Sequence, residues 1–144
     1  MTKPACVFCD IVEKKIPGHV VFEDDEVVAF LDVKPLFVGH VLVVPREHVV
    51  TLPDLPLESV GPFFERVQAI ARAVPEALGS QGTFVAMNNV VSQSVAHLHC
   101  HVVPRTKGDG LKGFFWPRTK YKSEEQMRET ADKLRRLIAL RARG

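Results

Sequence analysis

Three of the six histidines in this 144-residue chain fall within five residues. His97, His99 and His101 alternate with less polar residues, and alternate side chains of a β-strand point to the same face. The spacing predicts a strand over 96–104 with its imidazoles about 6–7 Å apart on one face and with Leu98, Cys100 and Val102 directed into the core. Three roles suit this pattern: an ordinary polar surface, a metal site of neutral imidazoles, or a histidine nucleophile flanked by phosphate-binding donors.

A second group of reactive side chains is the Cys6-x-x-Cys9 pair near the N-terminus. In a reducing compartment such a pair indicates metal binding or redox chemistry rather than a structural disulfide. A redox motif of the thioredoxin type would follow a strand, and no strand is expected before Cys6. Zinc is therefore favoured over a pair of buried free thiols, although two cysteines supply only half of a tetrahedral site.

Three helices are expected to position these groups. The spacing of apolar residues predicts a short helix over 6–15 and a long one that has Pro62 in its first turn and ends at Pro75. A last helix begins at the capping box formed by Ser123 and Gln126. The apolar stripe of the long helix has seven members, Val60, Phe63, Phe64, Val67, Ile70, Ala71 and Val74.

Five runs rich in β-branched and aromatic residues read as strands, over 19–23, 27–31, 39–45, 83–87 and 96–104. Most of their connections are of hairpin length or contain a helix. This order predicts an α+β fold, with a five-stranded antiparallel sheet, two main helices and a short N-terminal helix.

Composition limits the classes of function. A net charge of +2 gives no bulk attraction to a polyanion, so no nucleic-acid partner is expected. No apolar run approaches the roughly 20 residues of a membrane span, and the start of the chain lacks the apolar core of a signal peptide. The sequence predicts a cytoplasmic protein with a single domain over 1–144.

The segment His97-Leu98-His99-Cys100-His101-Val102-Val103 resembles the histidine-triad (HIT) signature, in which histidines alternate with apolar residues. Cys100 stands where an aliphatic residue is usual. The resemblance covers nearly the whole chain, including the Cys-x-x-Cys pair and the 39–48 segment. It implies the HIT-like fold, normally a homodimer, which here would use the long helix and the strand after it.

The resemblance implies that His99 is a nucleophile. It would attack the α-phosphorus of a purine nucleotide and form a covalent nucleotidyl-histidine that water hydrolyses. His101, Gln93 and Ser94 would donate hydrogen bonds to phosphate oxygens, and His40 would lie beside the nucleophile. The substrate is expected to be a nucleoside phosphoramidate or a dinucleoside polyphosphate.

The resemblance also implies how the nucleotide is held. Asp32 would accept hydrogen bonds from the ribose, and Asn88 or Asn89 would reach the phosphate or the leaving group. The loop after Asn89 is shorter than the usual family loop and lacks its glycines. The base would lie on five apolar side chains, Val7, Phe8, Ile11, Phe30 and Leu42.

For the cysteine pair, the resemblance implies a structural zinc ion held by Cys6, Cys9, His48 and His97. Such a closed site would fasten the N-terminal helix to the strand that carries the nucleophile. Two other functions remain open at this point. One is a nucleotide-binding regulatory module with little turnover, and the other is a metallohydrolase that uses all three histidines of the triplet.

Overall fold

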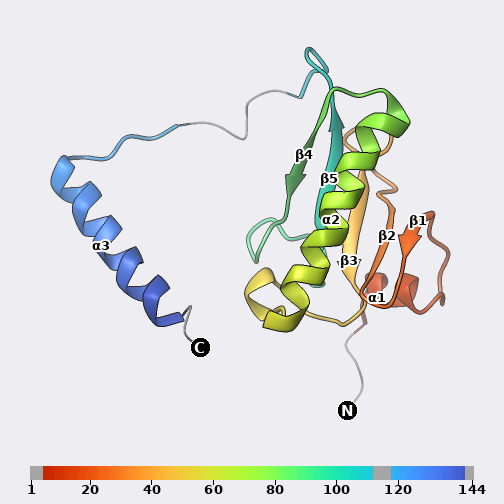
Figure 1. The fold of residues 1–144 in the computed structure, drawn as a ribbon, viewed down its shortest axis with the longest axis horizontal. Helices are drawn as coiled ribbons and strands as arrows, with labels where there is room; N and C mark the ends of the chain where they lie inside the picture. Colours follow the sequence, from red (N-terminus) through yellow and green to blue (C-terminus); the bar gives the residue numbers. More distant parts are fainter. Residues whose placement is uncertain (1–4, 112–117, 142–144) are drawn as a thin grey trace. The chain divides into compact units, whose positions relative to one another are not determined.

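The computed structural model describes residues 5–111 and 118–141 (Figure 1). Its backbone divides into two compact units, Met1–Asp109 and Gly110–Gly144. Within the described stretches, no helix combines the length and apolar character needed to cross a membrane. The assignment of residues 1–144 to a single domain stays a prediction.

The first unit is built on one antiparallel sheet with the strand order β1-β2-β3-β5-β4. This confirms the predicted α+β fold with five antiparallel strands. The lengths of the connections explain this strand order. The β1–β2 turn is short, which makes these two strands neighbours, whereas α2 carries the chain from β3 to β4 and a loop carries it on to β5. The strands are β1 (Val20–Glu23), β2 (Val27–Leu31), β3 (Val41–Pro45), β4 (Gly82–Ala86) and β5 (Cys100–Arg105), and the helices are α1 (Val7–Val12), the 3-10 turn η1 (Leu52–Asp54) and α2 (Leu57–Leu78).

The sheet has two buried faces because residues alternate along its central strands. Figure 1 shows α2 running across one face, where Val27, Val43 and Cys100 pack with the apolar stripe of the helix. On the other face, Phe30 and Leu42 pack with α1. The alternation thus directs one set of side chains into the larger core and the other set toward α1.

Helix α2 differs from its sequence prediction at both prolines. It begins at Leu57 and continues through Pro75 to Leu78, so Pro62 lies beyond the first turn and Pro75 does not end the helix. Each proline removes one intrahelical hydrogen bond. Burial of the apolar stripe offsets this loss, and the helix ends at Gly79, whose φ of 72° suits a residue without a side chain.

The second unit contains one described helix, α3 (Glu124–Arg141). Its start was predicted from the capping box and is confirmed. The hydroxyl of Ser123 accepts the Gln126 amide at 3.0 Å, and the side chain of Gln126 accepts the Lys122 amide at 2.7 Å. These bonds satisfy amides that have no partner within the helix.

Candidate active site and metal centre

A pocket of about 260 Å³ opens on the α1 side of the sheet. Helix α1 forms one wall. Strands β2 and β3, the loops at 17–18 and 32–34, and the histidine segment (residues 94–101) form the rest. Nine of the residues predicted to bind nucleotide or catalyse line it. They are Val7, Phe8, Ile11, Phe30, Asp32, Leu42, Ser94, His99 and His101.

The histidine segment is only partly a strand. β5 begins at Cys100, so His97 and His99 precede it. β3 ends at Pro45, which has no N–H to donate, and the paired ladder between β3 and β5 stops at Val43 and Cys100. The prediction of a strand over 96–104 was therefore too long at its start, but its alternation persists, because Leu98 and Cys100 enter the α2 core.

A hydrogen bond from Nδ1 of His99 determines which tautomer its neutral ring adopts. Nδ1 of His99 lies 2.8 Å from the carbonyl oxygen of His97. A carbonyl only accepts, so Nδ1 carries the hydrogen and the neutral ring keeps a lone pair on Nε2. The ring is 3% exposed, and its centroid lies 5.1 Å from that of Phe8, edge to face.

The tautomer of His101 follows from a chain of two hydrogen bonds. The backbone amide of Leu36 donates to Nδ1 of His40 at 3.1 Å, so neutral His40 carries its hydrogen on Nε2. That atom lies 2.8 Å from Nδ1 of His101 and donates to it. His101, which lines the pocket, therefore carries its own hydrogen on Nε2 and can donate to a bound ligand.

Both of these histidines are held neutral. Burial lowers the pKa of His40, with opposition from Asp32, whose carboxylate lies 3.8 Å away. Burial also lowers the pKa of His101 to about 4, and the neighbouring His99 and His40 act in the same direction. The centroids of the His99 and His101 rings lie 5.0 Å apart, closer than the 6–7 Å spacing predicted for one strand face.

Asp32 stands at the end of β2, with one carboxylate oxygen engaged. Its Oδ1 accepts the Lys34 amide at 2.9 Å. This Asx-type turn orients the carboxylate beside the pocket. The sequence analysis did not single out Lys34, which also lines the pocket. Its position two residues after Asp32 was the available signal.

The loop over 88–94 uses its polar side chains to hold itself in place. Gln93 donates to the carbonyl of Val50 at 2.6 Å and accepts the Val90 amide at 3.0 Å. Asn89 accepts the Leu52 amide at 2.8 Å, and Asn88 donates within the loop. None of these three side chains lines the pocket, so their proposed substrate contacts stay predictions.

A second cluster joins the residues predicted to bind metal. Figure 1 shows α1 beside the sheet. Cys6 and Cys9, at the start of α1, lie close to His48, which follows β3, and to His97. Their four donor atoms lie within 4.8 Å of one another. Sγ of Cys9 is 3.2 Å from Nδ1 of His48 and 3.5 Å from Nδ1 of His97. Sγ of Cys6 is also 3.5 Å from Nδ1 of His97. The Nδ1 atoms of the two histidines are 3.2 Å apart.

These spacings suit a tetrahedral ion. Zn–S and Zn–N bonds near 2.3 and 2.0–2.1 Å place neighbouring donors roughly 3.3–3.8 Å apart. Nε2 of His97 donates to the carbonyl of Pro45 at 2.9 Å, so in the neutral ring Nδ1 carries the lone pair that can bind a metal. The Cys9 amide donates to Sγ of Cys6 at 3.4 Å. The donor set therefore fits zinc.

This cluster separates the triplet into two parts. The ring of His97 joins the cysteines, while His99 and His101 line the pocket. Asp32, His40 and His101 also offer close donor atoms, but the hydrogen bond between the two imidazoles already uses one nitrogen of each. The three triplet imidazoles do not converge on one point, which argues against the metallohydrolase hypothesis.

A five-stranded α+β fold with a histidine-lined pocket beside a Cys₂His₂ cluster defines the class of protein. The HIT domain model matches residues 13–108, and the chain belongs to the HIT family. An uncharacterized HIT-like protein of Borreliella burgdorferi is 41% identical over 114 residues, which cover 74% of this chain and 79% of that protein. A crystal structure from Streptococcus mutans is similar with a TM-score of 0.85 at 31% identity, over 95% of this chain and 87% of that one.

Three further relatives have informative names. A zinc-bound histidine triad family protein from Mycobacterium smegmatis is 37% identical, with a TM-score of 0.71 over 94% of this chain and 97% of that one. An adenosine 5'-monophosphoramidase of Schizosaccharomyces pombe is 32% identical, over 84% of this chain and 90% of its own length. An adenylylsulfatase of Arabidopsis thaliana is 35% identical, over 74% of this chain and 55% of its own.

Proposed function

We propose that this HIT-family chain is a nucleotide hydrolase or transferase that cleaves at the α-phosphate through a covalent nucleotidyl-His99. The observation that carries the proposal is the bond from Nδ1 of His99 to the His97 carbonyl. It leaves the Nε2 lone pair available for attack, and His99 lines a pocket of about 260 Å³. The substrate is a purine nucleoside phosphoramidate or a dinucleoside polyphosphate.

The reaction has two displacement steps. Nε2 of His99 attacks the α-phosphorus and forms an N–P bond, while the bond to the leaving group breaks and the leaving group takes up a proton from solvent. Water then attacks the same phosphorus and gives up a proton to solvent, the N–P bond breaks, and the nucleoside monophosphate leaves. His99 is restored to its starting tautomer, since Nδ1 keeps its hydrogen and donates it to the His97 carbonyl throughout.

Donors around the phosphate stabilise charge that builds during each step. Nε2–H of His101 is fixed as a donor by the chain through His40 and Leu36. The hydroxyl of Ser94 also lines the pocket. A neutral imidazole donates without adding a charge that would oppose the positive charge that the His99 ring gains when it bonds to phosphorus, and the lowered pKa keeps His101 neutral at physiological pH.

The remaining pocket residues would hold the nucleoside. Asp32 would accept from the ribose hydroxyls. The apolar walls contributed by α1 and β2 would contact the base, and Phe8 also packs edge-on to the nucleophile, with ring centroids 5.1 Å apart. The names of the phosphoramidase and adenylylsulfatase relatives support an adenosine nucleotide with a variable leaving group.

The Cys₂His₂ cluster would hold zinc in a structural role. Four protein ligands close a tetrahedron and leave no open position for substrate. The ion would tie Cys6 and Cys9 of α1 to His97, whose carbonyl orients His99. The zinc-bound mycobacterial relative supports this assignment.

The proposal also includes a homodimer that uses α2 and β4. β4 lies at an edge of the sheet, its Val85 is 42% exposed, and Phe64 on α2 is 37% exposed. Light scattering at micromolar protein should give the mass of two chains, and Val85→Lys should lower it. A monomer mass for wild-type protein at all concentrations would contradict the dimer. A cytoplasmic location stays a prediction.

A kinetic panel tests the function. AMP-amidates, adenylylsulfate and diadenosine polyphosphates should be compared with wild-type protein and with His99→Asn. We expect turnover of at least one class by wild type, and a loss of at least about a thousandfold in the variant, within the range measured for removal of a nucleophile. Tight AMP binding without turnover of any class would instead favour the nucleotide-binding regulatory module.

A further inference from the structure

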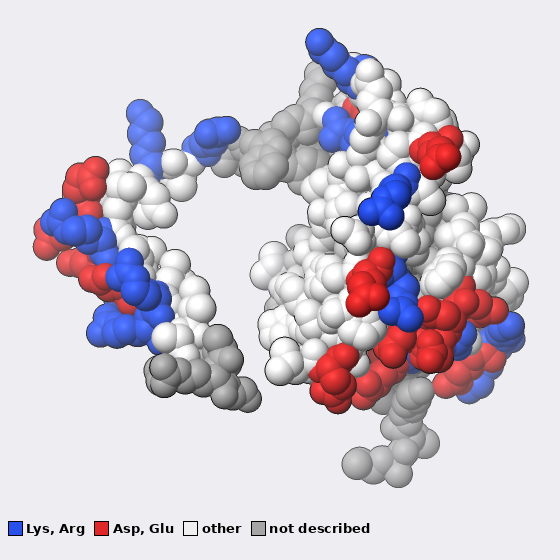
Figure 2. Space-filling view, viewed as in Figure 1, with Lys and Arg blue, Asp and Glu red and all other residues white. Residues whose placement is uncertain are grey.

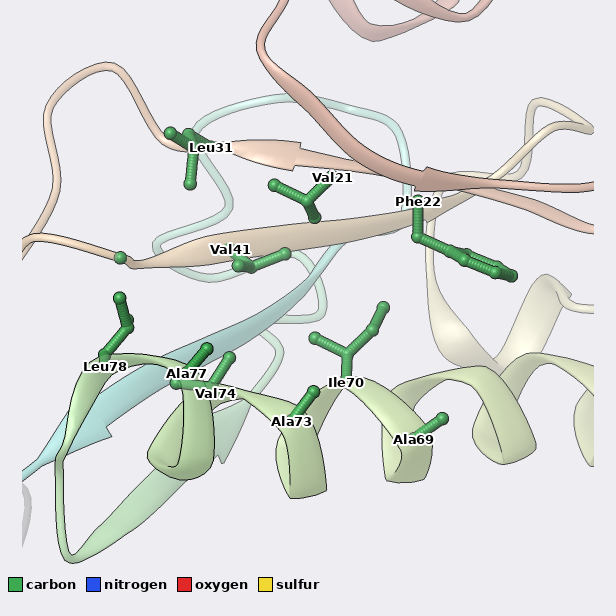
Figure 3. A pocket seen from close by; sticks show the side chains of 11 residues that line it. Val21, Phe22, Leu31, Val41, Ala69, Ile70, Ala73, Val74, Ala77 and Leu78 are labelled. Carbon is green, nitrogen blue, oxygen red and sulfur yellow. The ribbon is translucent and has the colours of Figure 1, made fainter.

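The histidine pocket contains charged residues, in contrast to the cavity on the other face of the sheet. Two charged residues, Asp32 and Lys34, line it, and Lys34 is the only lysine or arginine in that lining. Figure 2 shows acidic and basic side chains side by side on the face that it draws. The groove on the α2 face holds about 420 Å³, and all of its lining residues are uncharged (Figure 3). Of these two cavities, the histidine pocket therefore offers a cation to an anionic ligand.

The ammonium group of Lys34 is available to a ligand. Within the part of the chain that the structure describes, it has no hydrogen-bond or ion-pair partner. The two lysines of the neighbouring cavity are instead paired, Lys14 with Glu23 at 3.4 Å and Lys15 with Glu13 at 2.9 Å. A lysine that lines a pocket in this way can bind an anionic group of the substrate.

The backbone of Lys34 is held in place by its neighbours. Its amide donates to Oδ1 of Asp32 at 2.9 Å, and Pro35 disfavours a helical conformation at Lys34. The two ends of this loop are joined, because the Asp32 amide donates to the carbonyl of His40 at 2.9 Å. Within the loop, the Leu36 amide donates to the ring of His40 at 3.1 Å. The flexible four-carbon stem of Lys34 therefore starts from a fixed point of the pocket wall.

The direction of displacement brings the leaving group toward Lys34. In an in-line displacement, the leaving group departs on the side of phosphorus opposite the nucleophile. The ring of His99 is 3% exposed, so this opposite side faces the mouth of the pocket. Lys34 is exposed and lines the same pocket, which places its stem at the mouth. Since His101 and Ser94 are the donors assigned to the α-phosphate, the ammonium group of Lys34 is left for the leaving group.

We propose that Lys34 binds the leaving group and selects nucleotides whose leaving group is an oxyanion, a phosphate or a sulfate, over phosphoramidates. The inference rests on the proposed function and narrows its substrate. When the P–O bond breaks, the departing oxygen keeps the electron pair, and a nearby ammonium group stabilises this negative charge. A departing amine must take up a proton instead, and His101, whose pKa of about 4 leaves it neutral, holds no acidic proton for it. A neutral amine therefore gains nothing from Lys34.

A binding experiment tests the inference without requiring turnover. The background is His99→Asn, which cannot form the covalent adduct. The dissociation constants of AMP-amidate, adenylylsulfate and diadenosine triphosphate should be measured by calorimetry with and without Lys34→Gln. The three ligands share an adenylyl half and differ in the charge of the leaving group. We expect Lys34→Gln to raise the dissociation constant of an oxyanion ligand about tenfold, the effect of one hydrogen bond to a charged group, and to leave that of AMP-amidate within about twofold. Lys34→Arg, which keeps the charge, should retain the affinity.

The matched control is Lys107→Gln, which removes the same charge from an exposed residue outside the pocket lining. It should change the three affinities little and equally. A selective loss for adenylylsulfate alone would assign a sulfate leaving group, and one for diadenosine triphosphate alone would assign a polyphosphate. Equal changes for all three ligands, a loss matched by Lys107→Gln, or no binding of any ligand would overturn the inference. The proposed function fails separately, if wild-type protein binds these ligands with the expected selectivity but turns over none of them.

Discussion

Replacing His101 by Asn should weaken the dependence of stability on pH. The pKa of His101 lies at about 4 in the folded chain, against an ordinary value of 6.5, chiefly because the ring is buried. Between these values the unfolded chain binds a proton at this residue and the folded chain does not. The free energy of unfolding therefore falls as the pH drops from about 6.5 to about 4. Asn is the chosen replacement because its carbonyl oxygen can still accept from His40.

The size of the effect follows from the two pKa values. A tenfold change in proton affinity corresponds to about 1.4 kcal/mol, so the difference between 6.5 and about 4 sets an upper limit of about 3.4 kcal/mol. Partial exposure of the ring reduces the expected loss to about 1–3 kcal/mol. Urea unfolding at pH 7 and pH 4.5 should be measured for both proteins. Protonation of the metal ligands affects both alike and cancels in the difference. Identical pH dependence would refute the claim that burial keeps His101 neutral, and with it the assigned donor on Nε2.

Three further predictions follow from the pocket and the metal centre. Asp32→Asn preserves the acceptor for the Lys34 amide. Measured by calorimetry, it should weaken the binding of AMP by about 1.5–3 kcal/mol and the binding of 2′-deoxy-AMP by much less. Equal losses for the two ligands would show that Asp32 does not bind the ribose hydroxyls. Leu36→Pro removes the backbone amide that fixes the tautomer of His40. Relative to Leu36→Ala, it should lower kcat about tenfold, which corresponds to the free energy of one hydrogen bond. Equal rates would contradict the assignment of the His101 tautomer through His40. Elemental analysis should find about one zinc per chain. Chelation or Cys9→Ala should lower the melting temperature, since metal binding contributes folding free energy. An unchanged melting temperature would contradict the structural role of the zinc site.

Local patterns predicted the two faces of the histidine segment. Alternation alone assigned Leu98 and Cys100 to the core, and both are fully buried. It did not reveal where the strand begins. That depends on Pro45, which ends the neighbouring strand, and on the Leu98 amide, which donates to Val49 at 2.7 Å outside the ladder. Sequence spacing gives the direction of a side chain more readily than the partner of a backbone group.

Long-range partners account for what the sequence did not predict. Gln93 bonds to Val50, which is 43 residues away in the chain, and no local signal indicates this contact. Helix α2 likewise continues past Pro75 to Leu78, which no local signal indicates. By contrast, Cys6 and Cys9 carried a strong local signal, and the resemblance to the HIT family supplied the two histidines that gather with them.

The central claim is that His99 carries the nucleotidyl group during turnover. Wild-type protein should be mixed with an AMP-amidate, quenched with denaturant at neutral to alkaline pH within the first turnovers, and weighed intact by mass spectrometry. The account predicts an adduct of one adenylyl group per chain, mapped by fragmentation to His99 and absent in His99→Asn. Turnover without any adduct, together with retained activity in His99→Asn, would contradict the covalent mechanism.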